Sequence, residues 1–209
     1  PIIEQVVLAT WSKHLEKSQR DGSLPLVLEA PCPLLHQMRL FKEPIELESM
    51  REAARISSEA HELARNASHP GVNERFVQGL IEQYFLQQGA RGPAYGSIVA
   101  GGDNACVLHY TANNCPLRDG DLLLIDAGCS MNDYYNADIT RTFPINGSFS
   151  HEQLALYEVV LAAQKEAISA IFPGQNAEKV HMKAVRKLVE GLLDLNLLKN
   201  NTKNIIKQK

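Results

Sequence analysis

The spacing of hydrophobic residues predicts a helix at the start of the chain, followed by an extended linker. Residues 1 to 20 place apolar side chains near one face of a helix, and an Asp-Gly pair ends it. Three prolines follow within residues 24 to 41, and this density forbids a regular helix. We therefore expect an extended linker and a domain boundary near residues 21 to 40.

Two longer helices are predicted next. Residues 42 to 66 have helical spacing with Pro44 in the first turn, while residues 73 to 89 begin with a capping Asn73 and close with Gly89. The side chains that we expect to face inward are, in the first helix, Leu47, Met50, Ala54, Leu63 and Ala64 and, in the second, Phe76, Val77, Leu80, Ile81, Tyr84 and Phe85.

Two more helices are predicted near the end of the chain. Ser150 and Gln153 form a capping box for one that extends to about residue 172, and Asn176 starts the other. The polar, basic residues 199 to 209 show no contribution to a core. The side chains expected to face inward are, in the first helix, Leu154, Tyr157, Val160, Leu161, Ile168 and Ile171 and, in the second, Val180, Val185, Leu188 and Leu192.

Short strands are predicted between these pairs of helices. The apolar runs at residues 95–102, 106–111, 121–128 and 137–145 are separated by Gly, Asn and Asp, as strand connections usually are. Because the strands are grouped together and the helices lie outside the group, the order predicts an α+β fold and not alternating βαβ units.

Composition and charge exclude several classes of protein. The 209 residues suffice for one domain, or one domain plus a remnant, with an ordinary soluble composition. A net charge of −3 gives no basic footprint for nucleic acid, and no stretch approaches the roughly 18 apolar residues of a membrane span. No C-x-x-C pair occurs among the four cysteines, so reduced thiols and a cytoplasmic location are expected. The first residue is Pro and no signal peptide is readable, so we expect a processed chain or one that begins part-way through a longer protein.

Two aspartates stand at the ends of predicted strands. Asp126 ends the run LLLID, which could be buried on both faces, and Asp138 opens ADITRTF, with a spacing of 138 − 126 = 12. If the two lie directly opposite each other, the turn centres on Asn132. The pairing then needs a three-residue type of loop or a bulge, because a slip of one residue puts the carboxylates on opposite faces.

Two negative charges side by side in apolar strands need compensation. Like charges across strands destabilise a hairpin, and an unpaired buried carboxylate costs more. A divalent cation is one answer, since carboxylate oxygens suit Mn, Mg, Co or Zn ions and can support two metals roughly 3.5–4 Å apart. The alternative is that both aspartates cap turns or lie exposed at strand ends.

His109 also has two interpretations. It lies in the apolar run CVLHYT, where a lone histidine is more often a satisfied core residue. In the functional interpretation, it faces the same pocket as the aspartates and hydrogen-bonds a substrate carbonyl or stabilises a developing charge.

The stretches YGSIVAGGDNACVLHY and GDLLLIDAGCSMNDYYNADITRTFPINGSFS resemble the Xaa-Pro aminopeptidase (aminopeptidase P) family of pita-bread metallopeptidases. The resemblance runs from about residue 33 to residue 198. Methionine aminopeptidases share the fold and the paired aspartates, but LHY, LIDAG and DITRTFP are more similar to aminopeptidase P or prolidase. In this family the aspartate spacing is commonly one residue shorter, and we expect the loop around residues 132 to 133 to absorb the extra residue.

The resemblance implies the amino-terminal half of a pita-bread fold over residues 41 to 209, preceded by a remnant of an upstream domain and the linker at 1 to 40. It implies two divalent metal ions, most often Mn²⁺, held by two Asp, one His and two Glu. Asp126 and Asp138 match the two Asp ligands, and His109 matches an active-site histidine outside the metal shell. The implied reaction releases the N-terminal residue from peptides with proline in second position.

The family's other three ligands would lie beyond residue 209. His151 and His181 are the later histidines, and a core or surface role is favoured for both. We therefore expect a fragment that is inactive, or nearly so, by itself. Two alternatives stay open: a truncated, non-catalytic interaction module, and a prolidase acting on Xaa-Pro dipeptides. A homo-oligomer also stays open.

Overall fold

The computed structural model describes residues 2–22, 30–200 and 202–207. The contacts divide the chain into two compact units, Pro1–Leu47 and Glu48–Lys209, and each is described by itself. The α+β class is confirmed, because helices flank a small antiparallel sheet of three strands, with a two-stranded sheet beside it. The predicted domains at 1 to 40 and 41 to 209 stay a prediction. Within the described residues, no helix has both the length and the apolar character needed to cross a membrane.

The first unit contains α1 (Ile2–Asp21) and α2 (Cys32–Leu40). The first helix matches the prediction. The second corrects the expectation of an extended segment, because residues 32 to 40 are helical. Pro33 lies in the first turn of α2, where its missing N–H has no intrahelical partner to lose. Residues 23 to 29 of the predicted linker lie outside the described residues.

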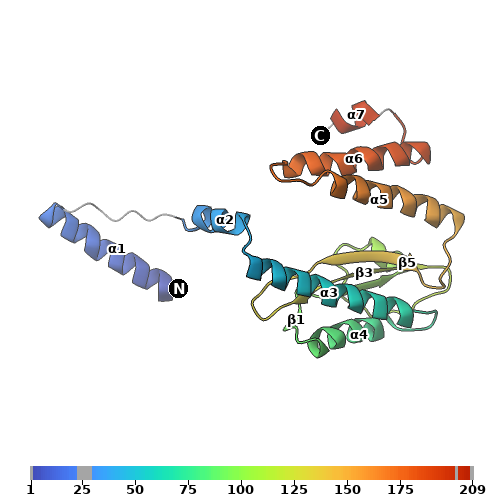
Figure 1. Ribbon diagram of the computed structural model, residues 1–209, viewed down its shortest axis with the longest axis horizontal. Helices are drawn as coiled ribbons and strands as arrows, with labels where there is room; N and C mark the ends of the chain where they lie inside the picture. The colour runs from blue at the N-terminus through green and yellow to red at the C-terminus, as the bar shows by residue number, and fades with distance from the viewer. Residues whose placement is uncertain (1, 23–29, 201, 208–209) are drawn as a thin grey trace. The chain divides into compact units, whose positions relative to one another are not determined.

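The second unit is built on a three-stranded antiparallel sheet in the order β2 (Ile98–Gly101), β3 (Leu122–Ala127) and β5 (Ile139–Pro144). Two helices, α3 (Pro44–Ala67) and α4 (Glu74–Gln87), cover one face of this sheet (Figure 1). The short strands β1 (Gly92–Pro93) and β4 (Cys129–Ser130) pair beside it.

The face that α3 turns to the sheet differs from the predicted one. Met50, Ala54 and Leu63 are exposed, and of the predicted positions Ala64 is buried. The buried face of α3 was missed because it contains two polar residues, and both of them bind main-chain groups at the end of a strand. The Ser57 hydroxyl accepts from Cys129 N at 3.0 Å, and His61 Nε2 lies 3.1 Å from Ala127 O. The buried face of α3 consists of Ala53, Ile56, Ser57, Ala60, His61 and Ala64.

The helix α4 follows its prediction more closely. Asn73 caps it by accepting from Arg75 N, and Gly89 follows its end with a φ of 84°. Val77, Ile81 and Phe85 are fully buried. Phe76 was expected inside but is 56% exposed, so the buried stripe is narrower than predicted.

The sheet is buried on one face and only partly covered on the other. Leu123, Ile125 and Ala127 of β3 are buried against the helices, whereas Leu122, Leu124 and Asp126 are half-buried. The run LLLID is therefore an alternating strand, and the prediction of burial on both faces is wrong.

The predicted strand at residues 106–111 is also absent. A short 3₁₀ helix, η1 (Gly102–Cys106), leads into a turn, and His109 within it has a φ of 56°. The residues on both sides of this segment, Gly101 and Cys115, bind the side chain of Glu74 in α4 through their main-chain N–H groups, as described below.

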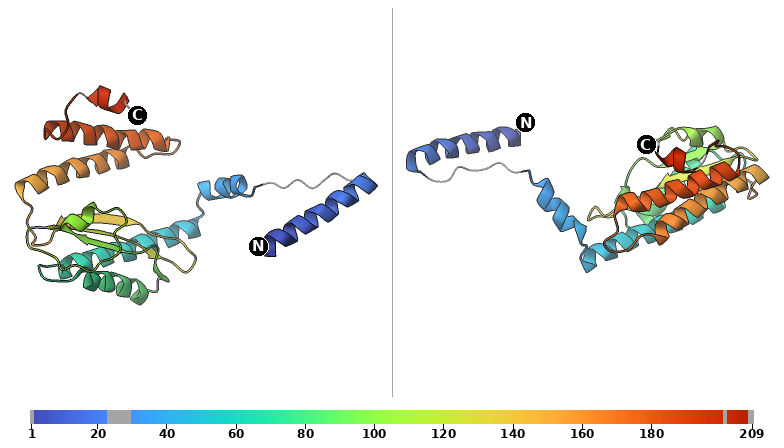
Figure 2. Two further views of the ribbon diagram at one scale, coloured as in Figure 1. Left: turned by 180° about the vertical axis from the view of Figure 1, so that it is seen from behind. Right: turned by 90° about the horizontal axis from the view of Figure 1, so that it is seen from above.

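The helices α5 (His151–Ser169) and α6 (Ala177–Asp194) lie side by side in all views (Figures 1 and 2). The predicted capping box of Ser150 and Gln153 and the Asn176 cap are both present. The helices approach closely at Gly191, where an added Cβ would lie 2.5 Å from a methyl carbon of Val159.

The predicted inward face of α5 is largely wrong. Leu154, Val160, Ile168 and Ile171 are all more than 40% exposed, and Ala163 is the buried residue of this helix. On α6 the predicted apolar positions are half-buried, beside the buried Val189, while His181 is exposed and not on the apolar side. The end of the chain forms a further helix, α7 (Thr202–Lys207), with half-buried Ile205 and Ile206, where no core contribution was expected.

Gly128→Ala tests the tightest backbone approach in the sheet. A Cβ at residue 128 would lie 1.8 Å from Ala137 O, so the two strand backbones would have to separate. We expect a loss of about 2–3 kcal/mol in the free energy of unfolding, measured by urea denaturation. The matched control is Gly79→Ala in α4, where nothing lies within 4 Å. It should gain about 0.5–1 kcal/mol, and equal effects of the two substitutions would contradict the close approach.

Candidate metal centre

The hairpin of β3 and β5 keeps one register from the sheet to its tip. Asp126 lies opposite Thr140, and the bridge between Ser130 and Asn136 continues the same register. At the tip, Met131 N donates to Tyr135 O at 2.8 Å and encloses a loop of three residues, 132 to 134. The loop thus takes the three-residue form.

This register corrects the centre of the turn. The turn centres on Asp133 and not on Asn132, so Asp138 falls opposite Gly128 and two residues away from Asp126 across the strands. An offset of two residues leaves both aspartates on the same face of the hairpin. Tyr134, the last residue of the loop, has a φ of 67°, as the last position of such loops commonly has.

The two carboxylates meet at one hydroxyl. The Tyr95 hydroxyl oxygen lies 2.6 Å from Asp126 Oδ1 and 2.8 Å from Asp138 Oδ1. It has one hydrogen, so it donates to one carboxylate at a time. Burial raises the pKa of Tyr95 well above its usual range, and the hydrogen bonds to the two carboxylates raise it further.

The aspartate pair is less buried than the sequence suggested. Asp126 is half-buried and Asp138 is exposed at the start of β5. Water therefore solvates part of both charges, and the cost of burial alone does not demand a counter-ion. Asp138 is thus exposed at a strand end, as the alternative interpretation expected. Separate turn caps or strand ends do not explain why both carboxylates converge on one oxygen atom.

The donor chemistry fits a divalent cation, but the donor set is incomplete. Two carboxylates on one face offer the hard oxygen ligands that Mn²⁺, Mg²⁺ and Ca²⁺ prefer. Within residues 2–22, 30–200 and 202–207, no three His, Cys, Asp or Glu side chains come together as a metal-holding group. The described residues thus offer Asp126 and Asp138 as candidate ligands and no third one beside them.

In the described part of the chain, no contact links His109 to Asp126 or Asp138. The histidine is exposed, lies in the turn after η1, and among the described residues makes no hydrogen bond to either carboxylate. Its exposure also excludes the satisfied core histidine. His151 and His181 are exposed as well. The role of His109 therefore stays a prediction.

For two residues, one in the candidate metal centre and one in the segment before it, the sequence predicted no role. Tyr95 opens the stretch YGSIVAGG, which we read only as a strand. Glu74 looks like an ordinary acidic residue in the first turn of a helix, yet its side chain is fully buried. A tyrosine before a glycine-rich strand and an acid beside an N-cap carry no specific pattern, so neither role was predictable.

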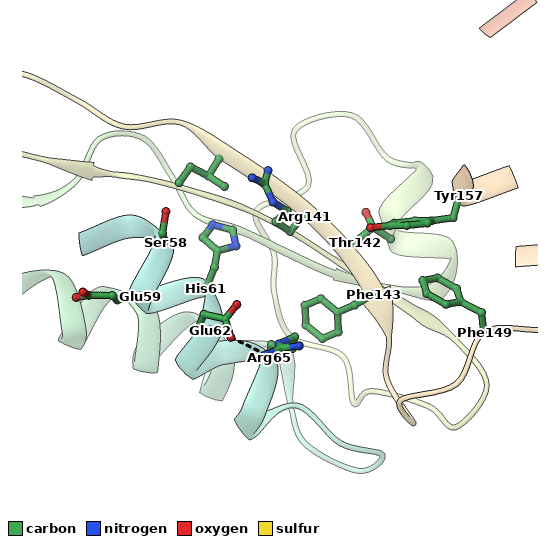
Figure 3. A pocket seen from close by; sticks show the side chains of 11 residues that line it. Ser58, Glu59, His61, Glu62, Arg65, Arg141, Thr142, Phe143, Phe149 and Tyr157 are labelled. Atoms are coloured by element: carbon green, nitrogen blue, oxygen red, sulfur yellow. Dashed lines mark hydrogen bonds and ion pairs between the residues drawn. The ribbon is translucent and has the colours of Figure 1, made fainter. Parts of the chain in front are cut away.

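A hollow of about 580 Å³ lies between α3 and β5 (Figure 3). His61 reaches toward it from α3 and Arg141 from β5, with Phe149 and Tyr157 at its other end. Burial lowers the pKa of His61, and the charge of Arg141 adds to this effect. Neither aspartate of the candidate metal centre lines this hollow.

The chain belongs to metallopeptidase family M24, whose model matches residues 48–204. It is 39% identical over 203 residues to the Xaa-Pro aminopeptidase of Escherichia coli, covering 97% of this chain and 46% of that protein.

Solved structures give the same picture. The chain is similar to aminopeptidase PepP of Pseudomonas aeruginosa (TM-score 0.91, 41% identity), covering all of this chain and 47% of that one. It is also similar to zinc-substituted E. coli aminopeptidase P in complex with product (TM-score 0.86, 41% identity), covering 94% of this chain and 44% of that one. The chain thus spans less than half the length of these relatives, and the pita-bread fold expected from the sequence is confirmed.

The shared hydroxyl predicts a pH dependence of stability. Folding raises the pKa of Tyr95 above the value of about 10 that it has when unfolded. The folded chain therefore keeps a proton that the unfolded chain loses, so this contribution is complete below pH 10 and is lost as the pH rises above it. Urea unfolding of the wild type should show this loss, and Tyr95→Phe should reduce the slope by at most about 1.4 kcal/mol per pH unit.

Tyr134→Phe, which removes the hydroxyl of an exposed ring, is the control for this measurement. Tyr84 and Tyr110 also have raised pKa values. Their contribution to the pH dependence of the free energy of unfolding is the same in both variants. An unchanged slope in Tyr95→Phe would contradict the shared hydrogen bond.

Proposed function

We propose that this chain carries part of the active site of a metal-dependent aminopeptidase that releases the N-terminal residue from peptides with proline in second position. One observation carries the proposal: in a chain of family M24, the side chains of Asp126 and Asp138 converge on the Tyr95 oxygen. The similarity to Xaa-Pro aminopeptidases supports the substrate class. Two divalent ions, Mn²⁺ by resemblance, are the proposed cofactors.

Each residue has a distinct task in this proposal. Asp126 and Asp138 would hold the ions from one face of the hairpin, and the strand pairing fixes the separation of the two carboxylates. The Tyr95 hydroxyl lies between the two carboxylates and orients them, donating its hydrogen to one of them at a time. When bound, the ions supply an activated water and polarise the scissile carbonyl. His109 donates a hydrogen bond to the substrate carbonyl, where negative charge develops.

The described residues do not complete this site. Two carboxylates rarely hold a catalytic ion, and no third ligand joins them in the described part of the chain. Catalysis therefore requires further ligands, which the resemblance identifies as one His and two Glu. We expect the 209-residue chain by itself to bind Mn²⁺ weakly and to hydrolyse no peptide.

Asp126→Asn and Asp138→Asn test the proposal in a full-length protein carrying this sequence. Loss of an outer partner of a metal ligand commonly costs 10–100-fold, so loss of a ligand should reduce kcat/KM by more than about 100-fold. Mn²⁺ affinity, measured by calorimetry, should fall in both variants. The substrates are a peptide with proline in second position and its alanine counterpart.

The matched control is Asp194→Asn, an exposed aspartate near the end of α6, which should change neither quantity. Unchanged Mn²⁺ affinity in both active-site variants would overturn the metal assignment. Equal hydrolysis of the proline and alanine peptides would overturn the substrate class.

A further inference from the structure

A buried carboxylate holds the segment that carries His109. Glu74 is the first residue of α4, and its side chain is fully buried. Its Oε1 accepts hydrogen bonds from Gly101 N and Asn104 Nδ2, both at 2.9 Å. Its Oε2 accepts from the Tyr110 hydroxyl at 2.8 Å and from Cys115 N at 3.0 Å. Glutamate is rarely buried completely, so four converging donors indicate a specific task.

All four donors lie in one segment, residues 101 to 115. This segment contains η1 and the turn with His109, and it has no strand partner over the predicted strand 106–111. Two of the donors are the main-chain N–H groups of Gly101 and Cys115, which flank the predicted strand. Glu74 therefore holds this segment at both of its ends.

Neutral donors compensate the charge of Glu74. Two main-chain N–H groups, one side-chain amide and one hydroxyl bind its oxygens, and the N-terminus of α4 adds a favourable dipole. With every lone pair of the carboxylate directed at this segment, the group has little left to offer another partner. Its contacts point to positioning and not to catalysis.

The end of the same segment has a second anchor. Asn113 is fully buried, accepts from Val99 N at 3.0 Å and donates to Ser97 O at 2.7 Å and to Gln78 Oε1 at 3.0 Å. The segment is thus fixed to α4 and β2 on both sides of His109. The histidine itself remains exposed, with left-handed backbone.

We propose that Glu74 is a positioning residue that holds the segment 101–115 and thereby presents His109 to the substrate. The inference rests on the proposed function, which gives His109 its contact with the substrate carbonyl. His109 directly precedes Tyr110, so the hydrogen bond from the Tyr110 hydroxyl to Glu74 fixes the chain one residue away from the histidine.

The geometry requires two acceptor oxygens on the side chain of residue 74. Each oxygen of Glu74 accepts from one main-chain N–H, of Gly101 or of Cys115. A glutamine must direct its NH₂ group at one of these two donors in either orientation of its amide. Glu74→Gln therefore leaves one buried N–H unsatisfied while keeping the volume of the side chain.

A double-mutant cycle in the full-length protein tests the inference. Glu74→Gln should lower kcat for the Xaa-Pro peptide by about 10-fold or more, because small misplacements of catalytic groups cost up to about 100-fold. In the background of His109→Ala, the same substitution should change kcat by less than about 2-fold, since its effect passes through His109. An equal loss in both backgrounds would mean a general structural role and would overturn the inference.

Hydrogen exchange gives a readout that is independent of activity. Glu74→Gln should accelerate amide exchange in residues 101–115 and leave β3 unchanged, whereas the control Glu48→Gln, an exposed acid of α3, should accelerate neither. Tyr110→Phe removes one of the four donors and should give a smaller effect at the same place, which also serves if Glu74→Gln does not fold. Unchanged or uniformly accelerated exchange would overturn the inference.

The two measurements separate the inference from the proposed function. If His109→Ala leaves kcat unchanged, the role of His109 in the proposed function fails. Exchange confined to residues 101–115 would then show that Glu74 holds the segment for another purpose, and the positioning of His109 would be refuted.

Discussion

The register of the β3–β5 hairpin is the constraint on which the candidate site depends. Two carboxylates on one face of a hairpin repel each other, so something must keep the strands from slipping. Leu123 and Ile125 do so, because a slip of one residue would turn these fully buried side chains to the half-exposed face. Gly128 permits the close backbone approach beside Asp138. The apolar face of the sheet therefore fixes the polar one.

The helix α3 supports this arrangement from behind the sheet. Its buried face is made of four small residues, one isoleucine and one histidine, and the small residues let the helix lie close to the strands. Ser57 and His61 bind backbone groups of Cys129 and Ala127, where β3 gives way to β4. These polar contacts fix the chain immediately after Asp126. Packing and hydrogen bonds on the helix-covered face of the sheet thus hold the strands that carry the two carboxylates. On the other face, Tyr95 contributes one hydroxyl between them.

Features that depend on neighbouring residues in the sequence were predicted correctly, whereas those that depend on distant parts of the chain were often wrong. The caps at Asn73, Ser150 and Asn176 form within a few residues, so the sequence alone predicts them. The burial of a helix face depends on what the fold places opposite. Leu154 and its neighbours on α5 have the spacing of a core stripe, but in the described structure the close partner of α5 is α6, at Val159. The sequence could predict that both aspartates lie on one face of the hairpin. It could not predict the residue at the centre of the turn, because that depends on the conformation of the loop.

The segment around His109 shows why an apolar run can fail to form a strand. Residues 106–111 have strand composition, yet Val107 and Leu108 are exposed. A strand needs a partner with free main-chain groups, and two N–H groups flanking this segment already bind Glu74. One buried carboxylate of α4 therefore binds the chain on both sides of this run, through contacts more than 25 residues apart in sequence. The hairpin and the His109 segment are consequently held by different interactions. Strand pairing holds the two carboxylates, whereas a network of hydrogen bonds around Glu74 holds the segment that carries His109. Replacing one carboxylate oxygen of Glu74 by an amide nitrogen would disrupt this network.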